Sequence, residues 1–283
     1  METIEQICAV LPPWLQPPFR RMADRQPEEL RLRAGQRPGI LCGGRELCLD
    51  ARCVAPDDLE AVVLAATAHS RYAAEAQLSA GFVSIPGGHR IGLCGRLVER
   101  GGQIVGIREL SSLCIRIARQ FPGAWRLSPP VDSTLIVGAP GCGKTTLLRE
   151  CVRLLSEQGQ RVALADERGE LAACVQGLPQ LDVGRRTDVL CGGSKAQSIM
   201  MLLRTMRPDW IALDEITAPE DVAAVEQCSY CGVRLLATAH AFCADELRQR
   251  PLYRKLMEAE VFRTLLLLDA SRNIRTERVN GSA

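Results

Sequence analysis

The sequence has no run of about 20 apolar residues, the length that a membrane-spanning helix needs. Residues 1–5 are acidic and lack the basic and then apolar order of a secretory signal. Aromatic residues make up only 4% of the chain, and no segment is rich in lysine or arginine. We therefore expect no membrane span, no export signal and no basic, aromatic stripe of the kind that binds nucleic acids.

Lysine is also scarce, since the chain has only Lys144, Lys195 and Lys255. The formal net charge of +2 favours neither a nucleic acid nor an acidic surface as a partner. The low lysine content matters for motif searches, because a pattern that requires lysine at one position rarely arises by accident in such a chain.

Cysteine is abundant, but its spacing is not that of a disulfide-rich or zinc-binding protein. The 13 cysteines are scattered through apolar stretches, where a small buried hydrophobic side chain fits. Cys228 and Cys231 form the only C-x-x-C pair, and no second pair follows at zinc spacing. An odd count without an export signal fits a reduced cytosolic compartment. We expect neither a disulfide framework nor a zinc site.

The length of 283 residues and the hydrophobic content of 47% predict two modest domains. A proline-containing linker is expected at residues 121–132. It separates a small α+β domain, residues 1–120, from an α/β domain, residues 133–283. In the first domain we expect strands at 29–33 and 113–117, a helix over 57–79 and a hairpin over 82–93.

The second domain alternates between strand and helix patterns, which predicts a parallel sheet. The expected strands are 134–138, 161–166, 210–214 and 233–238, followed by a closing hairpin over 261–279. The expected helices are 144–157, 195–206, 219–230 and 243–258.

A complete G-x-x-x-x-G-K-[ST] loop spans residues 138–145, between an apolar strand pattern and a helix pattern. Glycines in such a loop let backbone N–H groups point at phosphate oxygens, and the following helix N-terminus favours anions. Lys144 is expected to reach the β- and γ-phosphates, and the Thr145 hydroxyl to bind Mg²⁺. The predicted ATP-binding residues are Gly138, Ala139, Pro140, Gly141, Cys142, Gly143, Lys144, Thr145 and Thr146.

Polar residues follow three other expected strands. Asp214 and Glu215 come after an apolar strand, and we expect Asp214 to hold Mg²⁺ and Glu215 to polarise the attacking water. Asp166, Glu167 and Glu170 follow a second strand, and His240 follows a third. Ligands of open α/β sheets bind at the carboxyl ends of the strands, so these side chains are candidates to face the γ-phosphate. A charged helix start for the three carboxylates at 166, 167 and 170, and a structural role for His240, are the alternatives.

These motifs resemble those of the stage III sporulation protein AA family of endospore-forming bacteria. That family is similar to the type II and type IV pilus secretion ATPases. Residues 166–170 are similar to the acidic box of secretion ATPases, 237–240 to their histidine box, and 202–209 to the segment before their Walker B strand. Residues 81–96 are close to a signature of the sporulation family. The chain lacks the tetracysteine zinc insertion of some secretion ATPases.

The resemblance implies a RecA-like P-loop ATPase domain behind a smaller N-terminal α+β domain. It implies a homo-oligomeric ring, with a hexamer expected, that energises a membrane-associated secretion or channel complex during sporulation. The expected location is the cytoplasm of the mother cell, at the membrane through protein partners. Arg90 and Arg96 align with arginines that secretion ATPases direct from the N-terminal domain toward the nucleotide. Solvated strand arginines are the alternative.

Two rival functions use the same nucleotide site. One is a nucleic-acid-dependent P-loop ATPase, which the lack of a basic and aromatic surface pattern disfavours. The other is a scaffold that binds nucleotide without turning it over, which the intact pair Asp214 and Glu215 disfavours.

Overall fold

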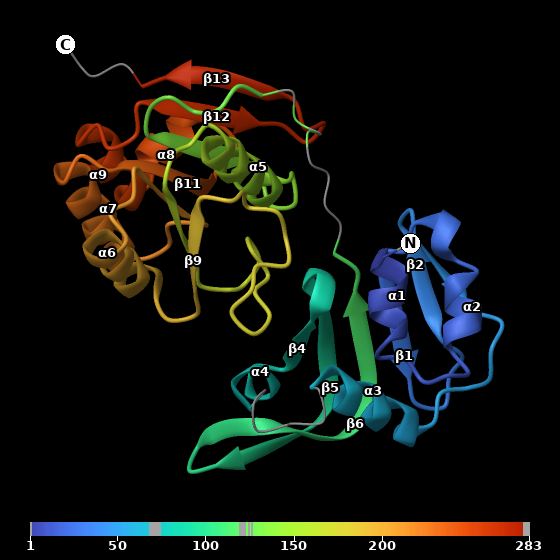
Figure 1. Cartoon of the computed structure of the whole chain (residues 1–283). Coiled ribbons are helices and arrows are strands. Elements are labelled where there is room, and N and C mark those ends of the chain that lie inside the picture. The colour runs from blue at the N-terminus through green and yellow to red at the C-terminus, as the bar shows by residue number, and fades with distance from the viewer. Residues whose placement is uncertain (1, 68–74, 119–122, 124, 126, 280–283) are drawn as a thin grey trace. The chain divides into compact units, whose positions relative to one another are not determined.

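The computed structural model describes the chain except for residues 1, 68–74, 119–122, 124, 126 and 280–283. It separates into two compact units, Met1–Arg119 and Gln120–Ala283 (Figure 1). The expected linker, residues 121–132, belongs to the start of the second unit, and its residues 121, 122, 124 and 126 lie outside the described part. The domain boundaries drawn from the sequence stay a prediction.

The first unit is built on a six-stranded antiparallel sheet with the order β3-β2-β1-β6-β5-β4. Apolar residues on one face of this sheet pack against α1, α2 and α3 to form a single core. The strands are β1 (Glu29–Arg33), β2 (Gly39–Cys42), β3 (Arg45–Cys48), β4 (Phe82–Ile85), β5 (His89–Arg100) and β6 (Gln103–Arg116). The helices are α1 (Glu2–Cys8), α2 (Gln16–Arg20), α3 (Pro56–Ala66) and α4 (Glu75–Ser79), with short 3₁₀ turns η1 (Ala23–Arg25) and η2 (Pro86–Gly88).

Strands β5 and β6 are much longer than the sequence analysis predicted. They are joined at a two-residue turn, Gly101 and Gly102, whose φ angles of 57° and 78° suit the tight hairpin turn that favours glycine at both positions. The helix expected over 57–79 was also wrong as a single element. The structure has α3 and α4 instead, and residues 68–74 between them lie outside the described part.

His89 is buried in the first unit, with only 1% of its surface exposed. Its Nδ1 accepts a hydrogen bond from the Ala118 N–H at 3.0 Å, and its Nε2 lies 3.2 Å from Gln6 Oε1. Burial lowers the pKa of His89 to about 4. The imidazole is therefore neutral in the folded protein at pH values where it is already charged in the unfolded chain.

We expect acid to destabilise the first unit through His89. The unfolded state binds the proton near pH 6.5 and the folded state only near pH 4, so the stabilisation is complete above pH 6.5 and is lost as the pH falls toward 4. The loss amounts to about 3 kcal/mol. Urea unfolding of the wild type and of His89→Gln at pH 7.5 and 4 measures it. A stability difference between the two proteins that does not change with pH would contradict this expectation.

The second unit contains a seven-stranded sheet with the order β13-β12-β7-β11-β10-β8-β9, parallel except for β13. The strands are β7 (Thr134–Gly138), β8 (Val162–Asp166), β9 (Thr187–Cys191), β10 (Trp210–Leu213), β11 (Arg234–His240), β12 (Thr264–Leu268) and β13 (Ile274–Arg278). The helices are α5 (Lys144–Glu157), α6 (Lys195–Thr205), α7 (Pro219–Tyr230), α8 (Ala244–Gln249) and α9 (Pro251–Glu258).

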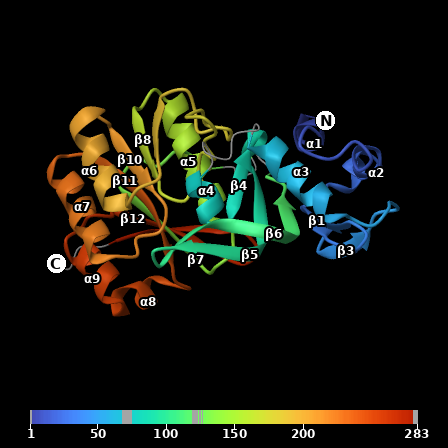
Figure 2. The same ribbon diagram turned by 90° about the horizontal axis from the view of Figure 1, so that it is seen from below.

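Alternate residues of the parallel strands face two different apolar cores. Leu135 and Val137 of β7 pack with residues of α6, α7 and α9, whereas Ile136 between them packs with residues of α5. Figure 2 shows α6, α7 and α9 together along one side of this unit, away from α5. The sheet is thus covered on both faces, which explains why its strands are continuous apolar runs in the sequence.

The elements expected in this unit are present, except that one helix is divided. The helix expected over 243–258 is divided into α8 and α9, because Arg250 is extended (φ −85°, ψ 121°) and Pro251 begins a new helix. The edge strand β9 was missed. Among the described residues, no helix combines the length and the apolar character that crossing a membrane requires.

Candidate nucleotide-binding and catalytic site

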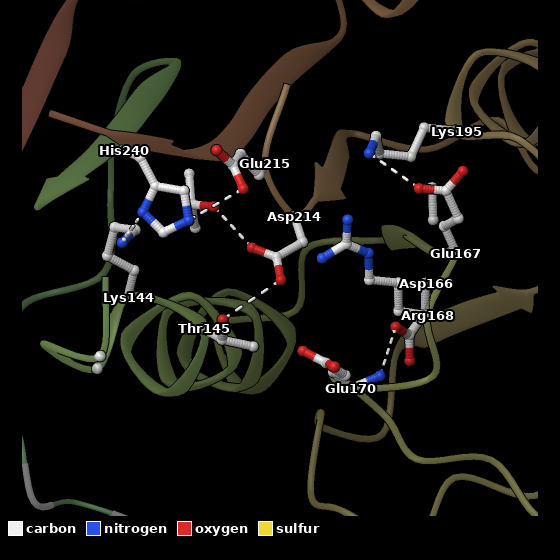
Figure 3. A pocket seen from close by; sticks show the side chains of 14 residues that line it. Lys144, Thr145, Asp166, Glu167, Arg168, Glu170, Lys195, Asp214, Glu215 and His240 are labelled. Atoms are coloured by element: carbon white, nitrogen blue, oxygen red, sulfur yellow. Dashed lines mark hydrogen bonds and ion pairs between the residues drawn. The ribbon is translucent and has the colours of Figure 1, made fainter. Parts of the chain in front are cut away.

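A cavity of about 300 Å³ lies at the carboxyl ends of β7, β8, β10 and β11. Several separate segments of the second unit contribute to it (Figure 3). The predicted site residues that line it are Gly141, Gly143, Lys144, Thr145, Glu167, Glu170, Asp214, Glu215 and His240. The other predicted residues of the loop, Gly138, Ala139, Pro140, Cys142 and Thr146, shape the loop and its helix without lining the cavity.

The loop after β7 needs its glycines for steric and conformational reasons. A Cβ at position 138 would lie 2.7 Å from the carbonyl oxygen of Leu268, so any larger residue would push β7 and β12 apart. Gly141 and Gly143 have φ angles of 78° and 106°, in the region that favours glycine. Gly143 is the N-cap of α5, so the N–H groups of the first turn of α5 face the cavity end of the loop.

Lys144 is buried, and its ammonium is held by the loop itself. Nζ donates to the carbonyl oxygens of Gly138 and Ala139, both at 2.9 Å, and lies 2.7 Å from Nδ1 of His240. Burial lowers the pKa of Lys144 below its ordinary value. A phosphate that enters the cavity would take the place of His240 beside this ammonium and would balance its positive charge.

Asp214 is fixed by two hydroxyl groups. Thr238 Oγ1 donates to Asp214 Oδ1 at 2.6 Å, and Thr145 Oγ1 donates to Oδ2 at 3.3 Å. A hydroxyl and a carboxylate side by side are the hard oxygen ligands that Mg²⁺ prefers, so these residues fit the metal. In the described part of the chain, no three His, Cys, Asp or Glu side chains are grouped to hold a metal. A metal at Thr145 and Asp214 would therefore share its coordination with phosphate oxygens and water.

His240 lies between Lys144 and Glu215, the glutamate that we expect to polarise the attacking water. Because an ammonium only donates, Nδ1 of His240 accepts from Lys144, and the proton sits on Nε2. That Nε2 lies 3.0 Å from Glu215 Oε2, to which it donates (Figure 3). Lys144, His240 and Glu215 thus form one continuous chain of polar contacts through a single imidazole.

The acidic segment after β8 divides into two kinds of residue. Asp166, the last residue of β8, borders the cavity but is only 2% exposed, and its carboxylate accepts hydrogen bonds from the backbone N–H groups of Glu170, Leu171 and Ala172, which makes it a loop anchor. Glu167 and Glu170 line the cavity as predicted. Glu167 accepts from Lys195 Nζ at 2.9 Å.

Lys195, Thr238 and Arg168 also line the cavity, and the sequence analysis assigned none of them a role. Lys195 begins α6, and its buried ammonium contacts Glu167 and, at 3.4 Å, the hydroxyl of Thr217. The scarcity of lysine was the available signal for Lys195. The chain has only three lysines, and two of them, Lys144 and Lys195, line this cavity.

Arg90 and Arg96 belong to the first unit. Arg90 lies over the ring of Phe82, 3.6 Å from its centroid, and Arg96 pairs with Glu109 at 2.6 Å where both are exposed. The pairing of β5 with β6 shifts register between Cys94 and Arg96, so Arg90 and Arg96 do not belong to one regular stretch of strand. Their catalytic role stays a prediction.

The arrangement of strands, loop and helices is that of known solved ATPases. The X-ray structure of the ATPase DotB from Legionella pneumophila superposes with a TM-score of 0.60 and 16% identity, covering 95% of this chain and 80% of that one. The pilus retraction motor PilT with bound ADP gives a TM-score of 0.58 and 15% identity, covering 88% and 76%. The fold is therefore that of a RecA-like P-loop ATPase domain with a smaller N-terminal α+β domain.

Comparison of the sequence with known proteins identifies the family, whereas the solved structures show only the fold. The family described as sporulation stage III, protein AA, matches residues 7–281. The stage III sporulation protein AA of Bacillus subtilis (strain 168) is 34% identical over 283 residues, covering 95% of this chain and 92% of that protein. An uncharacterised protein, ycf45 of Cyanidium caldarium, is 31% identical over 178 residues, covering 60% of this chain and 50% of that protein. The chain belongs to the stage III sporulation protein AA family.

Proposed function

We propose that this chain is a Mg²⁺-dependent ATPase that energises a membrane-associated secretion or channel complex during sporulation. The observation that carries the proposal is the meeting of Lys144, Thr145, Asp214 and Glu215 in one cavity. Lys144 and Thr145 come from the loop after β7, and Asp214 and Glu215 follow β10. A fold built only to bind phosphate would need the first pair and not the second.

In this proposal the loop amides and Lys144 bind the phosphates, while Thr145 and Asp214 hold Mg²⁺. Mg²⁺ held by these two residues would supply positive charge to offset the negative charge of the phosphates. Glu215 orients and polarises the attacking water, and the proton on Nε2 of His240 holds the glutamate in place. Glu167 and Glu170 border the same cavity and complete the candidate catalytic set.

The proposal extends to the assembly. A homo-oligomeric ring, expected as a hexamer, would turn over ATP in the mother-cell cytoplasm and reach the membrane through proteins of the sporulation channel. Arg90 and Arg96 would act from the first domain on the nucleotide of the same or a neighbouring subunit. The family membership and the ATPase fold support these statements.

The ATP turnover rate of the purified chain separates the proposal from its rivals. We expect turnover that rises when cytoplasmic domains of sporulation-channel membrane proteins are added and that does not respond to DNA or RNA. Stimulation by nucleic acid alone would favour the nucleic-acid-dependent ATPase. Tight ATP binding without hydrolysis, with and without the partner domains, would favour the nucleotide-binding scaffold.

A further inference from the structure

Arg168 lies at the tip of the tight turn that follows β8. The carbonyl oxygen of Asp166 accepts the N–H of Gly169 at 3.4 Å, so Glu167 and Arg168 occupy the two central positions of the turn. Gly169, with φ of 66°, lets the backbone leave the turn in the left-handed conformation. Because β8 ends beneath it, the turn presents Arg168 at the carboxyl edge of the sheet, where the cavity lies.

The turn is held by hydrogen bonds to Asp166 and from Arg149 of α5. The Asp166 carboxylate accepts the N–H of Ala172 at 2.8 Å. The guanidinium of Arg149, from α5, donates to the carbonyl oxygens of Glu170 and Leu171 at 2.7 and 2.6 Å. The backbone that carries Arg168 is therefore fixed before any ligand arrives, as electrostatic preorganisation requires.

The cationic side chains of Lys144, Lys195 and Arg168 all line the cavity, but they differ in their bonding partners. Of the two lysines there, Lys144 is bonded to loop carbonyls and His240, and Lys195 is paired with Glu167. Within the described residues, the guanidinium of Arg168 makes no hydrogen bond or ion pair, although several carboxylates line the same cavity. Figure 3 shows it pointing into the cavity toward Asp214.

We propose that Arg168 is a catalytic residue that binds the terminal phosphate of the nucleoside triphosphate, on the same subunit as the loop that binds it. This inference rests on the proposed function. The cavity side at Asp214 is where the metal and the attacking water would lie, and negative charge on the γ-phosphoryl oxygens has to be balanced there. A planar guanidinium can bind two of those oxygens at once.

The assignment differs from that of Arg90 and Arg96, which would come from the first domain. Arg168 supplies its charge from the same unit as the loop, so the site holds a γ-phosphate cation besides Lys144 without help from another domain or subunit. A diphosphate lacks the group that Arg168 binds. The residue should therefore distinguish triphosphate from diphosphate.

Equilibrium binding of ADP and of a non-hydrolysable β,γ-imido ATP analogue, both with Mg²⁺, tests the inference. We expect Arg168→Ala to lose affinity for the triphosphate analogue by about tenfold or more, as for a lost charge-assisted hydrogen bond, and to keep its ADP affinity. Single-turnover hydrolysis of ATP should fall by about 10³-fold. Arg168→Lys should recover part of both, because it restores the charge without the planar fork.

Arg254→Ala is the matched control, because Arg254 is an exposed arginine of the same unit that does not line the cavity. It should behave as the wild type in both assays. Triphosphate and diphosphate affinities that fall together in Arg168→Ala, or neither of which falls, would overturn the assignment while leaving the proposed function intact. Wild-type protein that binds neither nucleotide would overturn both.

Discussion

Glu215→Gln is expected to bind ATP almost as the wild type does and to hydrolyse it about 10²–10⁴-fold more slowly, as for a lost general base. Glutamine keeps an oxygen that can accept from His240 Nε2, which lies 3.0 Å from the native carboxylate, so the geometry of the cavity is retained. What is lost is the negative charge that polarises water. Equilibrium ATP binding together with single-turnover phosphate release separates the two effects.

The control for this variant is Glu226→Gln. Glu226 lies on α7, pairs with Lys255 at 3.1 Å and does not line the cavity, so the same chemical change there should leave hydrolysis unchanged. Phosphate release by Glu215→Gln at the wild-type rate would remove Glu215 from the water-activating role. Loss of ATP binding in that variant would instead assign the residue to the binding site.

Lys144→Ala should weaken the binding of both ADP and ATP by about 10- to 100-fold, because one or more charge-assisted hydrogen bonds to the phosphates are lost. The ammonium already sits at the loop, bonded to the carbonyls of Gly138 and Ala139, and a bound phosphate would take the place of His240. Isothermal titration with each nucleotide measures the effect. Lys255→Ala is the control, because this lysine is exposed on α9.

Nucleotide binding at Lys144 also bears on the contacts that link Lys144 through His240 to Glu215. If a phosphate draws Lys144 away, Nδ1 of His240 loses its hydrogen-bond donor. That nitrogen can then accept a hydrogen bond from another group at the bound nucleotide. ATP affinity of Lys144→Ala equal to that of the wild type would mean that the lysine serves only to hold the loop closed.

Much of the site was accessible from the sequence because its residues follow short apolar strands. The loop at 138–145 and the pair Asp214 and Glu215 sit at strand ends, and parallel strands bring their carboxyl ends to one edge. His240 reached the same cavity by the same argument. The alternation of strand and helix was enough to predict the parallel sheet.

The contacts that the sequence did not predict depend on which strands are neighbours in the sheet. Strand β10 lies beside β11, so Thr238 reaches Asp214 across 24 residues of sequence. Strand β9, which precedes α6, lies beside β8, so Lys195 at the start of α6 reaches Glu167 across 28 residues. No local pattern encodes such pairs. The buried role of Asp166 was hidden for a related reason, because its partners are backbone N–H groups, which any sequence supplies.

The account is tested most directly by following one turnover of ATP on the purified wild-type chain with Mg²⁺. It predicts one ATP site per chain, and phosphate release that is lost in a Lys144→Ala preparation made in the same way. Wild-type protein that binds no ATP, or that releases phosphate no faster than Lys144→Ala, would contradict it.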